Sequence, residues 1–243
     1  MMVAAVVTSM GRLAQLRVSM PMLLAHTEMK LCLVDYSCPD GSGAWAERVL
    51  AGGSWRDRIR VERSGPRPVF NKCEALNLGC RAAVERWKPQ WLCVLDADTL
   101  VTPALWEWMV ENLSSGRYYF FEGYKPRQDL SGVLVVSAED FVLSGGYDEG
   151  FDGWGAEDFD MRCRLFFKLG RPYQEIPCGL ARSIPHSDEQ RVRFYGVKEK
   201  RVSHLANQYR LIENVRRWTG KDLRDLRLNE VRALFGMRRD QLQ

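Results

Sequence analysis

The 243-residue chain lacks three features, each of which would have indicated a class of protein. No stretch approaches the roughly 18 uninterrupted apolar residues that a membrane-spanning helix requires. None of the seven cysteines belongs to a Cys-x-x-Cys pair, which argues against a disulfide framework and against a structural zinc site. Internal repeats and low-complexity segments are also missing, which argues against a repeat architecture or a disordered chain.

What is present fits one large core. Hydrophobic residues make up 46% of the sequence, enough for a single α/β domain with an appended helical segment. The apolar start, Met1 to Val7, lacks a basic leader and is expected to be a buried first strand rather than a signal peptide. Cys73 and Cys80 are seven residues apart on an expected helix, so we predict small buried thiols and a reducing compartment.

The charge is distributed unevenly along the chain. Residues 1–189 carry 21 Lys and Arg against 25 Asp and Glu, a balance of −4, whereas residues 190–243 carry 14 against 6, a balance of +8. Such a basic segment can attract an anionic membrane surface, a polyanionic acceptor or nucleic acid, and a solvated helix face explains it equally well. We expect a main domain over residues 1–190 and a basic helical extension over residues 191–243.

Apolar strands alternate with helices in the first part of the chain. The pattern predicts strands over residues 3–7, 31–34, 59–62 and 91–95, and helices over residues 12–25, 44–50 and 71–84. This alternation indicates an α/β fold with a parallel sheet. Thr102 followed by Pro103 predicts the start of a further helix, with the threonine as its cap.

Apolar runs and helical spacing also recur in the second part of the chain. We predict strands over residues 118–121 and 133–136, and helices over residues 138–144 and 159–169 and from residue 198 onward. The last helix is expected to bury an apolar stripe made of Leu205, Tyr209, Ile212, Val215 and Trp218.

Polar side chains follow several of the predicted strands. Thr8, Asp35 and the pair Asp96 and Asp98 each come directly after an apolar run. Because ligands of open α/β sheets bind outside the carboxyl ends of the strands, we expect these residues to converge on one site. Asp96 and Asp98 offer the oxygen donors that Mg²⁺ or Mn²⁺ prefers beside a diphosphate. Taken alone, two aspartates after a strand also fit a solvated turn.

Glu157 and Asp158 stand at an expected helix start, directly behind the sequence Gly153-Trp154-Gly155. A carboxylate in such a place can accept a proton from an attacking hydroxyl, and an indole offers a flat face to a sugar ring. Acidic residues at a helix start also occur simply because they complement the helix dipole.

His186 is one of three histidines and lies in an expected loop, Ile184-Pro185-His186-Ser187. It could add an imidazole nitrogen to the same cation, and mixed carboxylate and imidazole donors favour Mn²⁺ over Mg²⁺. A solvated loop histidine is the alternative interpretation.

An ordered series of motifs runs through residues 3–190. It comprises Phe70-Asn71-Lys72, Leu76-Asn77-Leu78-Gly79, Asp96-Ala97-Asp98, Ser131-Gly132-Val133, Gly145-Gly146, Gly153-Trp154-Gly155-x-Glu157-Asp158 and Arg182-x-x-x-His186-Ser187. In its order and spacing the series resembles the motif set of the beta-1,4-galactosyltransferases, and several elements are shared with the catalytic domains of bacterial chondroitin polymerases. Several motifs in one order are more specific than any one of them.

The resemblance implies a GT-A glycosyltransferase fold over residues 1–190, with a Rossmann-like mixed central sheet flanked by helices, and a helical C-terminal appendage. It implies an inverting enzyme that transfers a hexose or N-acetylhexosamine, of the galactose, N-acetylgalactosamine or glucose type, from a UDP-sugar to an acceptor hydroxyl. Mn²⁺ is the implied cofactor, with Mg²⁺ as the alternative. The acceptor would be a saccharide, a glycolipid or another hydroxyl compound.

The resemblance also assigns roles to individual residues. Asp158 would be the general base, with Glu157 beside it in contact with the sugars, and Asp98 and His186 would bind the metal. The donor nucleotide-sugar would be held by Thr8, Arg12, Asp35, Phe70, Lys72, Asp96, Trp154 and Gly155.

This chain departs from the family pattern at two positions. Ser183 stands where the galactosyltransferases carry a methionine metal ligand, three residues before His186, so metal preference can differ. Asp129 stands where they place an aromatic residue that restricts the donor's C2 substituent, so galactose is not assured. The family's Golgi anchor and luminal disulfides have no counterpart here, which fits a bacterial or phage-like cytoplasmic enzyme, with the inner membrane face as an alternative location.

Two other functions remain open at this point. A sugar nucleotidyltransferase would also use a metal at a strand end, but no glycine-rich, basic triphosphate loop is present. A catalytically silent UDP-sugar-binding partner subunit would keep the same pocket without turnover.

Overall fold

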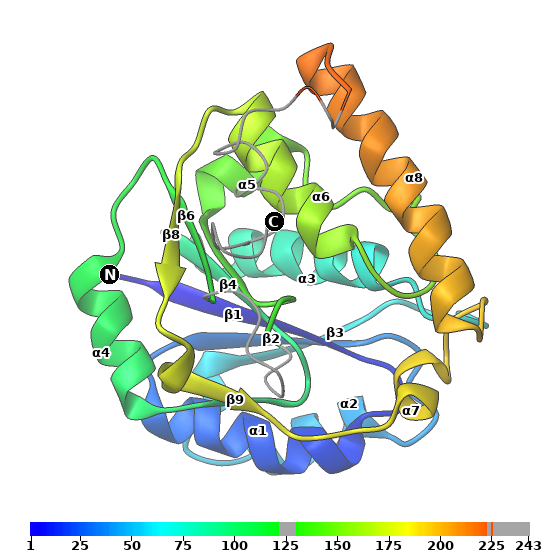
Figure 1. Cartoon of the computed structure of the whole chain (residues 1–243). Helices are drawn as coiled ribbons and strands as arrows, with labels where there is room; N and C mark the ends of the chain where they lie inside the picture. The colour runs from blue at the N-terminus through cyan, green and yellow to red at the C-terminus, as the bar shows by residue number, and fades with distance from the viewer. Residues whose placement is uncertain (122–129, 223–224, 226–243) are drawn as a thin grey trace.

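The computed structural model describes residues 1–121, 130–222 and 225. Its centre is a seven-stranded sheet with the order β3-β2-β1-β4-β7-β6-β8 (Figure 1). The strands are β1 (Val3–Ser9), β2 (Lys30–Asp35), β3 (Ile59–Arg63), β4 (Trp91–Leu95), β6 (Tyr118–Phe121), β7 (Leu134–Ser137) and β8 (Tyr173–Ile176). A second sheet pairs β5 (Thr99–Val101) with β9 (Ala181–Ser183).

The sheet is parallel in its first half and mixed in its second. Strand β1 runs parallel to β2 and β4, and β2 runs parallel to β3. Strand β7 is antiparallel to β4 and β6, and β8 runs parallel to β6. The alternation of strands and helices correctly predicted the parallel half, and the mixed sheet implied by the family resemblance is confirmed.

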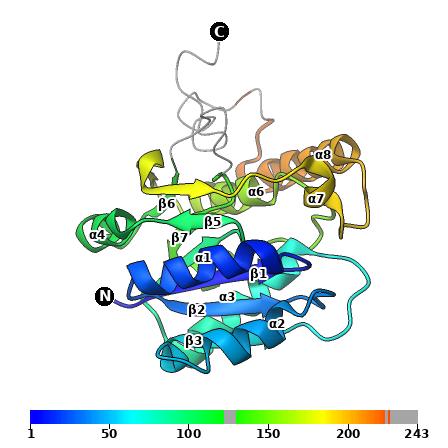
Figure 2. The same ribbon diagram turned by 90° about the horizontal axis from the view of Figure 1, so that it is seen from below.

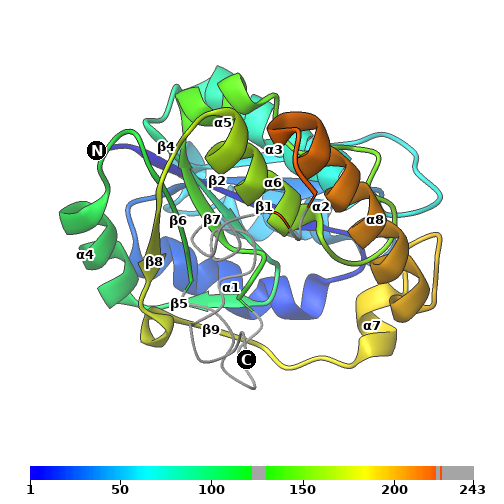
Figure 3. The same ribbon diagram turned by 45° about the horizontal axis from the view of Figure 1, so that its top comes forward.

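Helices cover both faces of this sheet. They are α1 (Leu13–His26), α2 (Ser42–Trp45), α3 (Lys72–Trp87), α4 (Pro103–Asn112), α5 (Ala138–Ser144), α6 (Glu157–Cys163), α7 (Asp188–Val192) and α8 (Lys200–Thr219). Single π turns extend α2 over Ala46–Leu50 and α6 over Arg164–Lys168, and short 3-10 turns lie at Arg56–Arg58 and Cys178–Leu180. Figure 2, seen from below, brings α1 to the front, and Figure 3 shows α6 and α8 side by side.

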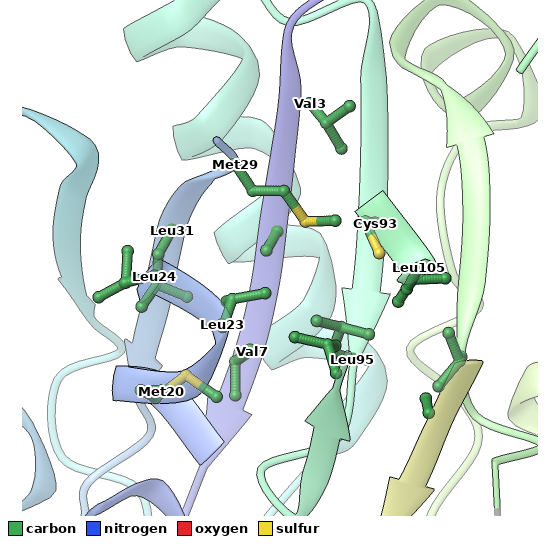
Figure 4. Packing of buried hydrophobic residues seen from close by; sticks show 14 of the residues in the cluster. Val3, Val7, Met20, Leu23, Leu24, Met29, Leu31, Cys93, Leu95 and Leu105 are labelled. Atoms are coloured by element: carbon green, nitrogen blue, oxygen red, sulfur yellow. The ribbon is translucent and has the colours of Figure 1, made fainter. Parts of the chain in front are cut away.

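Alternation along β1 divides the core between the two faces of the sheet. Val3, Ala5 and Val7 belong to the hydrophobic cluster on the side of α1, whereas Ala4 and Val6 belong to the cluster on the side of α3. Figure 4 shows the first cluster, in which Met20 and Leu23 of α1 lie over β1. Burial on both faces explains why the strand is apolar throughout and not alternating.

The predicted helix boundaries are largely confirmed. The Thr102 side chain caps α4 by accepting a hydrogen bond from the Leu105 amide at 3.3 Å, and Pro103 is the first helical residue. Helix α5 ends at Gly145, which adopts φ +87°. The short elements β5, β8, β9 and α7 were not predicted. Each has only three to five residues, and unlike the equally short β6 and β7 none of them contains an uninterrupted run of three or more large apolar side chains.

The predicted apolar stripe of α8 is wrong at two of its positions. Leu205 and Tyr209 are 54% and 63% exposed. The helix instead buries polar side chains: Asn207 Nδ2 donates to the Asp152 carbonyl at 2.9 Å, and Ser203 contacts the backbone of Trp154. Among the described helices, none has both the length and the apolarity needed to cross a membrane.

Candidate active site

A pocket opens at the carboxyl ends of β1 and β4. Its wall is formed by Thr8, Met10, Arg12, Phe70, Lys72, Asp96, Ala97, Asp98, Ser131, Gly132, Trp154, Gly155, Glu157, Asp158, His186, Gln190, Arg191, Phe194 and Tyr195. Residues between Thr8 and Tyr195, from widely separated parts of the sequence, therefore meet at one place. All the site residues expected from the sequence line this pocket except Asp35.

Asp35 lies at the end of β2 but not in the pocket wall. Its Oδ1 accepts a hydrogen bond from the Cys38 amide at 2.8 Å, and its Oδ2 would lie 2.1 Å from a Cβ at Gly43. The Asp35 carboxylate therefore stabilises the loop that follows β2 and does not face the pocket. Asp129, the position expected to affect donor specificity, lies outside the described residues.

Lys72 links the end of β4 to the start of α6. Its Nζ lies 2.9 Å from Asp96 Oδ1 and 3.1 Å from Glu157 Oε1. Burial favours the neutral amine, yet the two carboxylates outweigh it and raise the pKa of Lys72 well above its ordinary value. A Cβ at Gly132 would lie 2.5 Å from Asp96 Oδ2, so only glycine leaves room for this arrangement.

The β5–β9 pair brings His186 to Asp98. Strand β5 begins directly after Asp98, and its Thr99 is paired with Ser183 of β9. The Ile184 amide then donates to the Asp98 carbonyl at 2.9 Å, and His186 Nδ1 lies 2.9 Å from Asp98 Oδ2. Two residues 88 positions apart thus become neighbours through a short strand pairing that the sequence did not reveal.

The surroundings of His186 indicate its tautomer. Both neighbours of Nδ1, the Asp98 carboxylate and the Ile184 carbonyl at 3.3 Å, are acceptors, so Nδ1 carries the hydrogen. In the neutral ring Nε2 then carries the lone pair, the arrangement common for metal-binding histidines. Among the described residues, no group of three or more His, Cys, Asp or Glu side chains is placed to hold a metal ion. A cation held by Asp98 and His186 would need ligands beyond these two side chains.

The turn before α6 is built from left-handed backbone. Gly153 and Gly155 have φ of +75° and +101°, and Ala156, the residue before the helix, has φ +70°. A Cβ at Gly155 would lie 2.5 Å from His204 Nδ1 of α8. The glycines therefore allow α8 to approach closely and hold Trp154 at the pocket, where Lys200 Nζ lies 4.3 Å from the indole centroid.

The two carboxylates at the start of α6 have different surroundings. Glu157 is paired with Lys72, and its Oε2 is buried with no hydrogen-bond partner among the described residues. Asp158 is 13% exposed and lies 3.9 Å from Arg162. Burial and the neighbouring Glu157 charge raise the pKa of Asp158 to about 6, while Arg162 and Lys72 oppose the rise. A carboxylate with such a pKa is mostly ionised at neutral pH and can accept a proton.

Four pocket residues after His186 were missed from the sequence, namely Gln190, Arg191, Phe194 and Tyr195, and Met10 after β1 was missed as well. The Phe70 amide donates to the Phe194 carbonyl at 2.8 Å, and the rings of Phe70 and Tyr195 lie 5.4 Å apart. One signal was available, because Ser187 and Gln190 have the spacing of a helix capping box, which the structure forms at α7. These residues immediately follow His186 and span the predicted boundary at residue 190.

A family model described as glycosyl transferase family 2 matches residues 14–140, which is more than half of the chain. The chain belongs to glycosyl transferase family 2. A second model, described as the N-terminal domain of galactosyltransferase, matches residues 112–186 of this glycosyltransferase.

Curated relatives of the glycosyltransferase agree with the resemblance of its motifs. Beta-1,4-galactosyltransferase 5 of Danio rerio is 28% identical over 155 residues, and beta-1,4-galactosyltransferase 6 of Homo sapiens is 27% identical over 155 residues. Each alignment covers 56% of this chain and 37% of the relative. The chain thus spans little more than a third of the length of the curated relatives it matches. The similarity to beta-1,4-galactosyltransferases is confirmed.

Solved structures share the fold at low sequence identity. S. aureus TarS in complex with UDP gives a TM-score of 0.64 at 11% identity, covering 96% of this chain and 70% of that one. GalNAc-T7 with UDP, GalNAc and Mn²⁺ gives 0.63 at 16%, covering 87% and 47%. A mutant of Drosophila beta-1,4-galactosyltransferase 7 with manganese, UDP-Gal and xylobiose gives 0.56 at 16%, covering 84% and 79%. The predicted GT-A fold is confirmed.

Proposed function

We propose that this chain is a metal-dependent, inverting glycosyltransferase that moves a hexose or an N-acetylhexosamine from a UDP-sugar to an acceptor hydroxyl. The observation that carries the proposal is that Asp158, Glu157 and the Asp98–His186 pair line one pocket. A base for a hydroxyl and donors for a cation thus face the same space. The three solved structures above support the donor, since all hold UDP or UDP-Gal and two hold manganese.

Asp158 is proposed as the general base. It takes the proton of the acceptor hydroxyl while the acceptor oxygen forms a bond to the anomeric carbon of the donor sugar. The bond from that carbon to the diphosphate oxygen breaks, and UDP leaves with the electron pair. Attack on the face opposite the leaving group inverts the anomeric centre. Glu157, whose Oε2 lacks a partner among the described residues, would accept a hydrogen bond from a sugar hydroxyl.

Asp98 and His186 fit a divalent cation as a partial donor set. A carboxylate oxygen and an imidazole nitrogen together favour Mn²⁺ over Mg²⁺. Two protein donors suffice where phosphate oxygens of a substrate complete the coordination. When bound, the cation would neutralise charge on the departing diphosphate. Ser183, in place of the family's methionine ligand, lies opposite Thr99 in the β5–β9 pair.

The remaining pocket residues are proposed to contact different parts of the donor. Thr8, Arg12, Phe70, Lys72 and Asp96 would hold the uridine and its phosphates, and Trp154 with Gly155 would contact the sugar. Burial lowers the pKa of Arg12, and the Asp98 and Asp96 charges oppose this, so the guanidinium stays positive beside the pocket. The acceptor is proposed to be a saccharide or a glycolipid.

The first test is a donor screen. The full chain is incubated with UDP-galactose, UDP-N-acetylgalactosamine or UDP-glucose, with Mn²⁺, Mg²⁺ or chelator, and UDP release is measured with and without saccharide acceptors. We expect metal-dependent release from at least one donor, and NMR of the product should show a β linkage from the α-linked donor. A product that keeps the α configuration would contradict inversion.

The alternatives give different outcomes in the same series. A nucleotidyltransferase would release pyrophosphate from a nucleoside triphosphate and a sugar phosphate, and would leave UDP-sugars intact. A silent subunit would bind UDP with Mn²⁺ yet cleave none of the donors. Either result would overturn the proposed transfer.

A further inference from the structure

Arg162 lies on α6 four residues after Asp158, and nothing in the proposed reaction yet uses it. Its side chain is 4% exposed. Burying a guanidinium is unfavourable unless its charge and its donors are compensated. The groups that surround Arg162 therefore indicate its role.

Two aromatic rings and one backbone carbonyl hold the guanidinium. Its central carbon lies 4.1 Å from the centroid of the Phe120 ring on β6 and 5.3 Å from that of Phe159 on α6. Both rings lie within cation–π range. Nη2 donates a hydrogen bond to the Ser131 carbonyl. Ser131 lines the active-site pocket, so Arg162 connects helix α6 to the Ser131 part of the pocket wall.

The same nitrogen faces the proposed base. Arg162 Nη2 lies 3.9 Å from Asp158 Oδ2, too far for a hydrogen bond but close enough for a strong charge interaction. Asp158 Oδ1 accepts from the Phe159 amide at 3.0 Å. Asp158 lines the pocket and Arg162 does not, so the guanidinium can stabilise the carboxylate without filling the space meant for a substrate.

Other charged and titratable groups around Asp158 act in both directions. Glu157 opposes its ionisation and Lys72 favours it, but Lys72 is shared between Asp96 and Glu157 at 2.9 and 3.1 Å. Tyr147 and Cys163 also lie near, and burial raises the pKa of each well above its ordinary value, so both are neutral around pH 7.

Glu175 of β8 is the other carboxylate in the neighbourhood of Arg162. Burial raises the pKa of Glu175, and the Arg162 charge opposes the rise. Among the described residues, however, Asp158 is the carboxylate that comes within 4 Å of the guanidinium. Lys72 is already paired with Asp96 and Glu157, whereas Arg162 has Asp158 as its nearest carboxylate among the described residues.

We propose that Arg162 is a positioning residue that keeps Asp158 ionised and ready to accept the acceptor proton, while fixing the Ser131–Gly132 wall of the pocket. The inference rests on the proposed function for the role of Asp158. Its physical content, the coupling of the two side chains, can be tested without any turnover.

The kinetic test is the pH dependence of kcat/KM for UDP release. In Arg162→Gln the acid limb should move upward by about 1 to 3 pH units, because an adjacent guanidinium lowers a carboxyl pKa by about that amount. Arg162→Lys keeps a positive charge at this position, so it should bring the acid limb most of the way back to its wild-type position. Arg164→Gln is the matched control, since Arg164 is on the same helix but pairs with Asp160, and its acid limb should stay in place. An equal loss of rate at every pH in Arg162→Gln would indicate a structural role only.

The second test measures stability and needs no activity. Loss of Arg162 should raise the pKa of Asp158 further, so the fall in melting temperature from Arg162→Gln should be larger at about pH 8 than at about pH 5. In the Asp158→Asn background this difference should disappear. If it persists there, Arg162 does not act through Asp158. If it disappears although no donor is ever cleaved, the coupling holds and the proposed function fails.

Discussion

Asp158 and Asp160 make an instructive pair, because they lie two residues apart on α6 and each has an arginine four residues later. Asp160 is 1% exposed and accepts hydrogen bonds from Arg164 at 2.8 Å and from Asn214 of α8 at 2.7 Å. Asp158 is 13% exposed, its arginine stays 3.9 Å away, and its carboxylate lines the pocket. One carboxylate has its hydrogen-bonding capacity used inside the protein, and the other keeps capacity for a ligand.

One short helix therefore carries a structural carboxylate, Asp160, and the proposed catalytic one, Asp158. Burial is the first cause of the raised pKa of both residues. The partners then decide the outcome, since close hydrogen bonds tie Asp160 to α8 while Asp158 remains available to a substrate. The following predictions test that separation.

The largest expected effect is on turnover in Asp158→Asn. An amide cannot take the acceptor proton, and general-base catalysis contributes about 10² to 10⁴ in rate, so we expect kcat to fall about 10³-fold. UDP release is the measurement. Binding of UDP with Mn²⁺, followed by calorimetry, should be retained, and unchanged turnover would remove Asp158 from the role of base.

Asp160→Asn should show the opposite pattern. It leaves Arg164, whose side chain is 13% exposed, without its ionic partner, and breaking such a buried pair costs about 3 kcal/mol of unfolding free energy. Chemical denaturation measures this loss. The kcat of the folded fraction should change little, and a large fall in kcat at normal stability would contradict the division between the two carboxylates.

The stability of Asp158→Asn should depend on pH. Since the pKa of Asp158 is raised to about 6 in the folded protein, the carboxyl favours folding at low pH, and this contribution is lost as pH rises through about 6. Above that pH the asparagine variant should therefore be more stable than the wild type, by about 3 kcal/mol for a pKa difference of about 2 units at about 1.4 kcal/mol per unit. Melting curves between about pH 4 and pH 8 test the sign, and a constant difference would contradict it.

The smallest effect is predicted for Asp98→Ala, which removes one of two protein donors for the cation. We expect UDP binding in the presence of Mn²⁺ to weaken by at least about tenfold, as is typical when support of a metal site is lost. Calorimetry with Mn²⁺ and with chelator separates the metal-dependent part. Asp160→Asn, on the far side of α6, serves as the control and should bind normally.

Local signals predicted much of the fold and of the site. The apolar runs before Thr8 and Asp96 correctly placed the first near the end of β1 and the second directly after β4. Each of these depends on a few neighbouring residues, which a sequence displays directly.

Features that depend on distant partners were not predictable. Thr99 pairs with Ser183, 84 positions later, through two strands of three residues each, so nothing local reveals the pairing. The buried face of α8 is partly polar, because Asn207 and Asn214 satisfy acceptors in the segment 148–160. A hydrophobic periodicity cannot report such a face, which is why Leu205 and Tyr209 were assigned to it wrongly.

The contact between α8 and Trp154 has a consequence for how the protein could change its substrate. Ser203 Oγ accepts from the Trp154 amide at 3.2 Å and lies 3.3 Å from its carbonyl, and a Cβ at Gly153 would approach the Ser203 Cβ to 2.5 Å. The backbone that carries the indole is thus held from outside the sheet, in part by one small side chain on a surface helix. A substitution there would change the position of Trp154 while leaving the carboxylates, the histidine and the proposed nucleotide contacts in place.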